Sequence, residues 1–263
     1  MMETITSRTN QLIKKAVQLK SRKFRDRYGL FLMEGIRSAE EAVASGRRGT
    51  IFVTEEALSR DRVAALVEKG EDRWRFCTVP ETLMKDMTGT EHSQEVLAMI
   101  EKSAPPSLPE GRLTGRALLL DGIQDPGNMG TILRTAAASG VKAVFLTKGS
   151  TDPYGEKAVR SSMGAILRLP VYEGLLPSNV AALRKRCGLP LIGTALEGAK
   201  PYRKAPFFRE GIFVFGNEGN GITTEILSLC DEKIYIPLAG GVESLNVTAA
   251  AAVILFYYAE PLT

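Results

Sequence analysis

Three loop sequences of this chain combine glycine and asparagine directly after a predicted strand. They are DPGNMGTILR (125–134), FGNEGNGI (215–222) and IPLAGGVESLNVTAA (236–250). Glycine lets backbone groups approach a ligand closely, and asparagine both donates and accepts hydrogen bonds. Because ligands of open parallel sheets bind at the carboxyl ends of strands, we expect the three loops to line one crevice. Taken singly, each loop is also compatible with a simple turn, and Ser244 and Asn246 with a cap of the final helix.

The first loop excludes the common nucleoside triphosphate site. Gly122 and Gly127 have the spacing of a phosphate-binding P-loop. That motif needs a lysine and a magnesium-binding hydroxyl, but Asn128 and Met129 stand at those positions. The G-x-G-x-x-G motif of a dinucleotide-binding unit is also missing from these loops. A site built from asparagines, backbone groups and one arginine suits a ligand of low negative charge.

Cysteine and histidine usage argues against a metal site and against histidine-based catalysis. Cys77, Cys187 and Cys230 are far apart and odd in number, which is atypical of a disulfide framework or a zinc site. The single histidine, His92, has no cysteine near it in sequence. A Ser-His-Asp or Cys-His mechanism would have to use His92, and no neighbouring motif supports one. We therefore expect no metal.

Composition indicates an ordinary globular protein of the cytoplasm. The 263 residues are 44% hydrophobic and 24% charged, which is typical of a chain with a full core. The apolar segment VTAAAAVILFYYA is too short to span a bilayer. The first twenty residues lack the apolar region of a signal peptide. We expect a cytoplasmic location and no membrane partner.

The segment from Arg8 to Arg27 is strongly basic and contains a single acid, Asp26. Such a block is typical of a polyanion-binding surface, and Phe24 and Tyr28 between the charges can stack on bases. The alternative is a solvated helix face. The residues predicted to contact nucleic acid are Arg8, Lys14, Lys15, Arg22, Lys23 and Arg25.

Strand and helix patterns predict two α/β domains joined by a proline-rich linker. The linker SAPPSLPEGR covers 103–112 and separates a small three-layer α/β domain (1–102) from a larger one (113–263). Short apolar runs without polar alternation predict a parallel sheet in the larger domain. The final helix, within 244–260, is apolar nearly all round, which predicts deep packing. Strands are expected at 30–35, 49–56, 73–79, 95–102, 116–122, 142–149, 168–174, 190–196, 211–214 and 232–240, and the other helices at 11–20, 37–46, 60–70, 129–140, 155–166 and 179–188.

The three loops together resemble the motifs of the SpoU (TrmH-like) RNA ribose 2'-O-methyltransferases of the SPOUT superfamily. NMGTILR fits the N-x-G-x-x-x-R motif, and VFGNEGNGI and IPLAGGVESLNVTAAAAV follow in the order and spacing of that family. VRSSMGAILRLPV (159–171) is similar to the stretch between the first two motifs. The resemblance covers about residues 115–260. The N-terminal part, with YGLFLMEGIRSAEEAV, resembles the small L30e-like ribosomal-protein fold that serves many members as a substrate domain.

This resemblance implies a fold, an activity and partners. The fold is a SPOUT-type α/β domain with a parallel sheet and a C-terminal trefoil knot, which pattern reasoning alone would not propose. S-adenosylmethionine is the implied cofactor, and a homodimer through the knot region is the implied assembly. The implied reaction is methylation of an RNA ribose 2'-hydroxyl, and the extra domain favours 23S ribosomal RNA over transfer RNA. A transfer RNA methyltransferase, a base methyltransferase and a non-catalytic RNA-binding paralogue are the alternatives.

The resemblance also assigns site residues. The knot loops hold the adenosine largely through backbone groups of Thr194, Gly216, Ile236 and Leu245. Because a guanidinium stays protonated in proteins, we expect Arg134 to stabilise the developing alkoxide rather than to act as a base. The implied catalytic residues are Asn128, Arg134, Glu218, Ser244 and Asn246.

Two further segments have open interpretations. Arg160 is either a phosphate contact or an exposed helix arginine. KPYRKAPFFR (200–209) interleaves basic and aromatic residues. It either touches RNA or is a solvated loop whose Phe207 and Phe208 enter the core.

Overall fold

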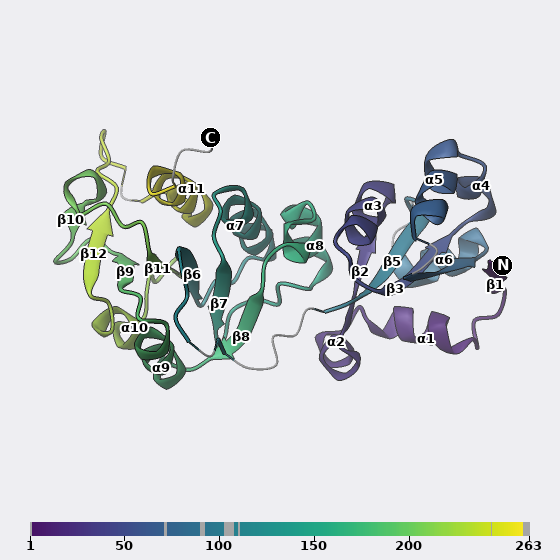
Figure 1. Ribbon diagram of the computed structural model, residues 1–263, viewed down its shortest axis with the longest axis horizontal. Helices are drawn as coiled ribbons and strands as arrows, with labels where there is room; N and C mark the ends of the chain where they lie inside the picture. The colour runs from purple at the N-terminus through teal and green to yellow at the C-terminus, as the bar shows by residue number, and fades with distance from the viewer. Residues whose placement is uncertain are drawn as a thin grey trace. The chain divides into compact units, whose positions relative to one another are not determined.

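The computed structural model describes residues 2–70, 73–89, 93–102, 108–109, 111–242 and 244–259. His92 and most of the predicted linker lie outside the described residues. The chain forms two compact units: an N-terminal unit of Met1–Ser103 with Tyr154–Leu167, and a C-terminal unit of Ala104–Pro153 with Arg168–Thr263 (Figure 1). The predicted domain boundaries stay a prediction, because compactness groups 154–167 with the first unit whereas the sequence counts this segment with the second.

The N-terminal unit is built on a mixed five-stranded sheet. Its strand order is β1-β4-β3-β5-β2; β1, β4 and β3 are parallel, and β5 is antiparallel to both β3 and β2. The elements are β1 (Glu3–Thr4), α1 (Gln11–Gln18), α2 (Arg22–Tyr28), β2 (Leu30–Glu34), α3 (Ile36–Ala44), β3 (Gly49–Val53), α4 (Glu55–Leu58), α5 (Asp61–Gly70), β4 (Trp74–Thr78), α6 (Glu81–Thr88), β5 (Val96–Glu101), α8 (Glu156–Ser162) and the 3-10 turn η1 (Ala165–Leu167).

Helices cover both faces of this sheet, as the alternating pattern predicts. The amide of Leu12 donates to Asn10 Oδ1 at 2.8 Å and starts α1. Ile13, Ala16 and Leu19 recur at helical spacing and are buried against α6 and one face of the sheet. Helices α3 and α5 lie on the opposite side (Figure 1). Helix α6 was not expected from the sequence.

The C-terminal unit contains a seven-stranded sheet in which every pair of neighbouring strands is parallel, so the predicted parallel sheet is confirmed. Its order is β10-β12-β9-β11-β6-β7-β8. The elements are β6 (Arg116–Asp121), α7 (Pro126–Ala138), β7 (Ala143–Thr147), β8 (Val171–Leu175), α9 (Pro177–Cys187), β9 (Leu191–Thr194), β10 (Lys200–Pro201), the 3-10 turn η2 (Tyr202–Lys204), β11 (Gly211–Gly216), α10 (Thr224–Ser228), β12 (Glu232–Tyr235) and α11 (Val247–Tyr257).

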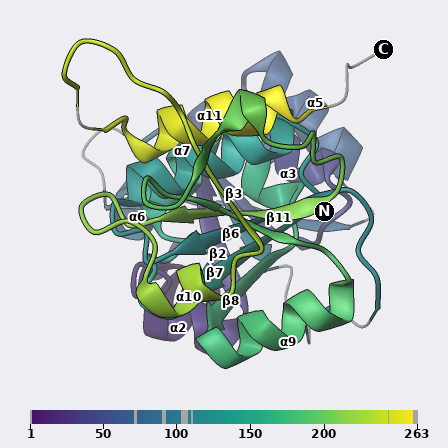
Figure 2. The ribbon, with the colours of Figure 1, turned by 90° about the vertical axis from the view of Figure 1, so that its left-hand side faces the viewer.

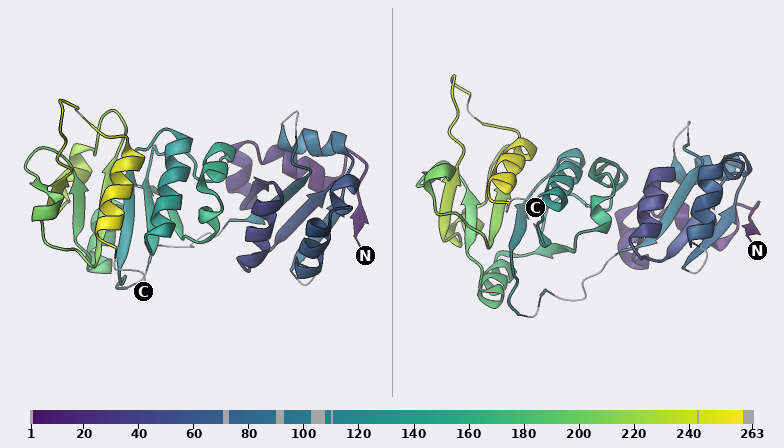
Figure 3. Two further views of the ribbon diagram at one scale, coloured as in Figure 1. Left: turned by 90° about the horizontal axis from the view of Figure 1, so that it is seen from above. Right: turned by 45° about the horizontal axis from the view of Figure 1, so that its top comes forward.

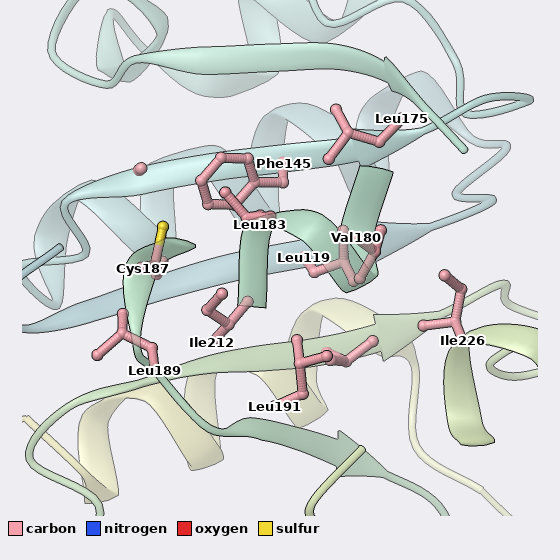
Figure 4. Close-up of a cluster of buried hydrophobic side chains, with 13 residues drawn as sticks. Leu119, Phe145, Leu175, Val180, Leu183, Cys187, Leu189, Leu191, Ile212 and Ile226 are labelled. Atoms are coloured by element: carbon pink, nitrogen blue, oxygen red, sulfur yellow. The ribbon is translucent and has the colours of Figure 1, made fainter. Parts of the chain in front are cut away.

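Helices pack on both faces of the parallel sheet. Helices α7 and α11 lie on one side, and α9 and α10 on the other (Figure 2). The α9 side is filled by a cluster that includes Phe145, Leu183 and Leu191, each fully buried (Figure 4). Because both faces are covered, the strands are continuous apolar runs such as ALLL and IFVF.

The strand order reverses beside β6. From β6 the chain continues outward through β7 and β8, whereas β11, β9 and β12 lie on its other side. Asp121 at the end of β6 is in register with Gly216 at the end of β11. Ligands of open parallel sheets bind at the carboxyl ends of the strands beside such a switch point.

Helix α11 is buried on one face only, so the predicted deep packing is confirmed for that face and wrong for the other. Ala251, Ile254 and Leu255 are buried, and the helix lies along α7 in both views of Figure 3. Val253 and Phe256 are 38% and 50% exposed on the other face. Alanine-rich sequence allows close helix contact on one side, but one neighbouring helix and one sheet cannot surround an entire helix.

Candidate functional site

A cavity of about 520 Å³ lies at the carboxyl ends of β9, β11 and β12 and is closed on one side by α11. The four residues predicted to bind the cofactor, Thr194, Gly216, Ile236 and Leu245, all line this cavity. Glu218 and Ser244, two of the predicted catalytic residues, line it as well. Asn128, Arg134 and Asn246 do not.

Gly216 is required by the tight turn that follows it. The backbones of Asn217 and Gly221 exchange hydrogen bonds of 2.9 and 3.0 Å, and Asn217 Oδ1 accepts from the amides of Gly219 and Asn220, both at 3.0 Å. A Cβ atom on Gly216 would lie 2.1 Å from the carbonyl carbon of Gly221. The turn over 217–221 therefore packs directly against the backbone of Gly216, and a side chain at position 216 would not fit.

Glu218 connects this turn to the first motif, ninety residues earlier in the chain. Its Oε1 accepts from Asn128 Nδ2 at 2.9 Å and from the Asp125 amide at 3.2 Å, and its Oε2 accepts from the Gln124 amide at 3.2 Å. Asp125 in turn caps α7, because its Oδ1 accepts from the Asn128 amide at 2.8 Å. The carboxylate of Glu218 thus holds the loop that begins α7.

The surroundings of Glu218 favour its ionised form. Partial burial alone would raise its pKa, but hydrogen bonds from Asn128 and from backbone amides, including those of Gln124 and Asp125, outweigh burial and lower the pKa below the ordinary 4.5. The residue is nevertheless exposed, so solvent screens its contribution to stability. A carboxylate with a lowered pKa is a poor proton acceptor near neutral pH. Glu218 is therefore suited to positioning α7.

The lowered pKa predicts a pH-dependent stability difference between the wild type and Glu218→Gln. A group whose pKa is lower in the folded state stabilises that state above its unfolded-state pKa, and this contribution is lost as pH falls through the folded-state pKa. We expect the wild type to melt at the higher temperature at pH 7, and the difference to close as pH falls below 4.5. Thermal unfolding from pH 7 to 3.5 measures it; a difference that is constant over this range contradicts the proposed interaction.

Arg134 and Asn246 occupy different settings. Arg134 lies in α7 with an exposed side chain, and within the described ranges it has no carboxylate or other hydrogen-bonding partner. Asn246 is the N-cap of α11: its Oδ1 accepts from the Thr248 amide at 2.8 Å and from the Thr248 hydroxyl at 2.7 Å. The interpretation of Asn246 as a helix cap is confirmed. Its catalytic role stays a prediction.

Comparison with known protein families identifies the family to which this chain belongs. The model of the SpoU rRNA Methylase family matches residues 115–256. The chain belongs to the SpoU rRNA methylase family. The MRM3-like substrate binding domain matches residues 10–98 of the same chain. The family membership that the motifs predict is therefore confirmed.

Relatives of this SpoU-family chain match it over nearly its whole length. The 23S rRNA (guanosine(2553)-2'-O)-methyltransferase RlmP of Bacillus subtilis (strain 168) is 35% identical, over 97% of this chain and 99% of the relative. The 23S rRNA (uridine(2479)-2'-O)-methyltransferase of Streptomyces viridochromogenes is 30% identical, over 96% and 90%. The crystal structure of an AdoMet-bound rRNA methyltransferase from Sinorhizobium meliloti superposes with a TM-score of 0.84 at 27% identity, over 98% of this chain and 97% of that one.

A buried polar network of this SpoU-family chain was missed at the sequence level. Asp121 is 3% exposed. Its Oδ1 accepts from the Thr147 hydroxyl at 2.8 Å, and its Oδ2 accepts from the amide and hydroxyl of Thr223 at 2.7 and 2.8 Å. These bonds tie the ends of β6 and β7 to the segment before α10. In the sequence, the only sign of this network is an aspartate, Asp121, at the end of an apolar strand.

The basic residues predicted to contact RNA divide into three groups. Lys14, Lys15 and Lys23 have no carboxylate partner in the part of the chain that the structure describes. Arg8 is ion-paired with Asp86 at 2.7 Å and Arg22 with Asp26 at 3.6 Å, both exposed pairs that solvent weakens. Arg25 forms the third group, because it is buried.

Arg25 is only 7% exposed and serves the fold. Its Nη1 donates to the carbonyls of Leu19 and Lys20 at 2.6 and 2.9 Å, which satisfies acceptors at the end of α1. We leave it out of the RNA-binding surface proposed below, because a phosphate would have to displace these bonds. Sequence alone does not distinguish this arginine from its neighbours.

The structure places both segments that have two interpretations. Arg160 is an exposed helix arginine on α8, ion-paired with Glu156 at 3.3 Å, and its contact with an RNA phosphate stays a prediction. Phe207 and Phe208 pack on Tyr258 with ring centroids 5.4 and 5.5 Å apart. Their rings thus join an aromatic cluster, although Phe207 remains 51% exposed.

The described residues include no group of three or more potential metal ligands. Over the same residues, no helix is long and apolar enough to cross a bilayer.

Proposed function

We propose that this protein methylates a ribose 2'-hydroxyl of 23S ribosomal RNA with S-adenosylmethionine as the methyl donor. The observation that carries the proposal is the meeting of the family motifs at one place: the four predicted cofactor residues line one cavity, and Glu218 joins that cavity to Asn128 of the first motif. The predicted enzyme class and cofactor are confirmed by the family match and by the AdoMet-bound neighbour.

The cavity suits S-adenosylmethionine in size and charge. Its volume of about 520 Å³ lies within the range of about 300–1,000 Å³ for small-molecule sites. Among the described residues that line it, none is a lysine or arginine, whereas Glu197 and Glu218 are acidic. This lining suits a ligand with a positive sulfonium and disfavours a polyphosphate. When bound, the cofactor supplies an electrophilic methyl group.

The residues of the chain position the acceptor and stabilise charge. Thr194, Gly216, Ile236 and Leu245 would hold the cofactor. Arg134 is free to engage the ribose oxygen or the adjoining phosphate, and its charge stabilises the alkoxide that develops as the hydroxyl loses its proton. A neighbouring phosphate or water takes that proton. Glu218 and Asn128 fix the start of α7 and so the place of Arg134.

The choice of 23S ribosomal RNA rests on full-length relatives that are named for that substrate. A test is to map 2'-O-methyl groups on total RNA from a deletion strain and its parent, because this group protects the neighbouring linkage from alkali. We expect one protected site in 23S RNA to be lost. Loss of a site in transfer RNA instead supports the transfer RNA alternative. Unchanged maps, with no cofactor binding by calorimetry, support a non-catalytic paralogue.

The same proposal includes the knot, the fold of the substrate domain, the oligomeric state and the cellular location. The C-terminal segment forms a trefoil knot, and the substrate domain has an L30e-like fold. The protein is a homodimer through the knot region and acts in the cytoplasm on ribosomal RNA. The exposed apolar face of α11, with Val253 at 38%, Phe256 at 50% and Tyr257 at 37% exposure, supports an interface there, since such a face is stabilised when it is covered.

Charge placed on this face tests the homodimer. We expect the wild type to have twice the chain mass in light scattering, and Phe256→Asp to be monomeric because a carboxylate would be desolvated in the interface. Leu176→Asp, which changes a residue of similar exposure (47%) before α9, is the matched control and should stay dimeric. A monomeric wild type, or a dimeric Phe256→Asp, contradicts the interface.

A further inference from the structure

The N-terminal unit contains a crevice of about 480 Å³ that carries four cationic side chains. They are Lys15 of α1, Arg48 before β3, and Arg73 and Arg75 at the start of β4. The three arginines are exposed, so they form the rim. Glu101 is the single acid among the described lining residues. We name this site the arginine crevice.

Most of the cationic charge of the crevice has no carboxylate partner among the described residues. Arg75 is ion-paired with Glu3, and Arg73 Nη1 donates to the Gly46 carbonyl at 3.2 Å. Arg48, Arg73 and Lys15 have no carboxylate partner within the residues that the structure describes. Three unpaired cations around one hollow raise the local concentration of anions.

The inner surface of the crevice includes apolar side chains. Met99 is 3% exposed, and Leu12 and Leu30 are partly buried at the edge of the core. Thr50 and Glu101 add polar groups that can pair with the edges of a base. An apolar floor inside a cationic rim matches a nucleotide, whose base has flat apolar faces and whose phosphates are anionic. The volume of about 480 Å³ lies within the range of small-ligand sites and suits a single nucleotide.

The crevice is continuous with the basic surface of α1 and α2. Lys15 Nζ lies 5.2 Å from the centroid of the Tyr28 ring, and Tyr28 stacks on Phe24 with centroids 5.9 Å apart. Arg27 and Lys23 lie over the same two rings at 5.8 and 6.0 Å. Lys15 thus connects a strip of stacked aromatic and cationic side chains to the crevice.

We propose that the arginine crevice binds an unpaired nucleotide of the substrate RNA, with its base on the apolar floor and its phosphates at Arg48 and Arg73. This inference rests on the proposed RNA substrate and adds a recognition site in the N-terminal unit, apart from the methyl-transfer cavity. The basic helices follow the RNA backbone, and the crevice selects a site where a base is free to leave its stack.

The test uses the full chain and an unmodified 23S ribosomal RNA transcript in filter binding. We expect Arg48→Glu/Arg73→Glu to raise the Kd for the transcript at least about tenfold. We also expect the plot of the logarithm of the association constant against the logarithm of the salt concentration to become shallower by about 1.5, because two phosphate contacts are lost. Arg48→Glu alone is the second variant, because Arg48 has no partner whose loss would disturb folding. Arg48→Lys/Arg73→Lys should retain most of the affinity, since the phosphates need charge.

The matched control places the same charge change on the opposite side of the sheet. Arg37→Glu, compared with Arg48→Glu alone, changes an exposed residue near the start of α3 and should leave Kd within about twofold, because salt screens distant charges. The same transcript containing 4-thiouridine should crosslink to the tryptic peptide 49–60, which contains Thr50. Charge reversals that match the control, or crosslinks confined to α1 and α2, overturn the proposal.

Failure of this inference is distinguishable from failure of the proposed function. Calorimetry with S-adenosylmethionine should give the wild-type Kd for every crevice variant, because the cofactor cavity lies wholly in the C-terminal unit. A wild type that methylates RNA while the crevice variants bind it normally overturns the crevice alone. A wild type that binds neither cofactor nor RNA overturns both.

Discussion

Arg134→Lys is expected to lower kcat about 100-fold to 1,000-fold while the Kd for S-adenosylmethionine stays unchanged. The guanidinium is planar and donates in a fixed fork, whereas an ammonium is a compact point charge that cannot reproduce a bidentate contact. Loss of one preoriented group that stabilises a developing oxyanion typically reduces kcat by this amount. Single-turnover methylation of the transcript measures the change, and calorimetry measures cofactor binding.

The structure makes this result interpretable as chemistry rather than folding. Arg134 is exposed on α7 and has no partner among the described residues, so its replacement should change stability by no more than about 0.5 kcal/mol. Arg186→Lys, on the exposed surface of α9, is the matched control and should retain full activity. Full activity of Arg134→Lys would refute the bidentate role of Arg134. An equal loss of activity in Arg134→Lys and Arg186→Lys would show that the loss is not specific to Arg134.

Gly216→Ala is expected to abolish cofactor binding and to lower the melting temperature. The added methyl group would lie 2.1 Å from both the Gly221 carbonyl carbon and the Ile222 amide nitrogen, and backbone atoms cannot rotate away as a flexible side chain can. The turn over 217–221 must open, which displaces Glu218 from the loop before α7. Overpacking of this kind costs about 1–3 kcal/mol or more.

Gly219→Ala provides the matched control within the same turn. A Cβ atom there meets only Asn217 Oδ1, at 3.7 Å, an ordinary contact. Calorimetry should show S-adenosylmethionine binding within about twofold of the wild type for Gly219→Ala, and at least about 100-fold weaker binding for Gly216→Ala, since a lost site costs several kcal/mol. Equal affinities for the two variants would show that the turn is not part of the cofactor site.

The sequence by itself determined the local elements, the parallel sheet and the chemistry of the family. Apolar periodicity depends on neighbours a few residues away, so the strand at 116–122 and the helix at 129–140 were predictable, although α7 begins three residues earlier, at Pro126. The three glycine- and asparagine-containing loops were predictable for the same reason. Their motifs also identified the family, because residue types at fixed spacing are visible without coordinates.

Only the tertiary structure decided which distant groups meet and which faces remain free. Glu218 reaches Asn128 because the strand order places β11 beside β6, a pairing that no local pattern specifies. Arg25 is buried although its neighbours are exposed, and α11 keeps one apolar face uncovered. The arginine crevice gathers side chains from α1, β3 and β4. Long-range packing sets these results, since contacts between distant segments depend on how the strands are ordered and connected.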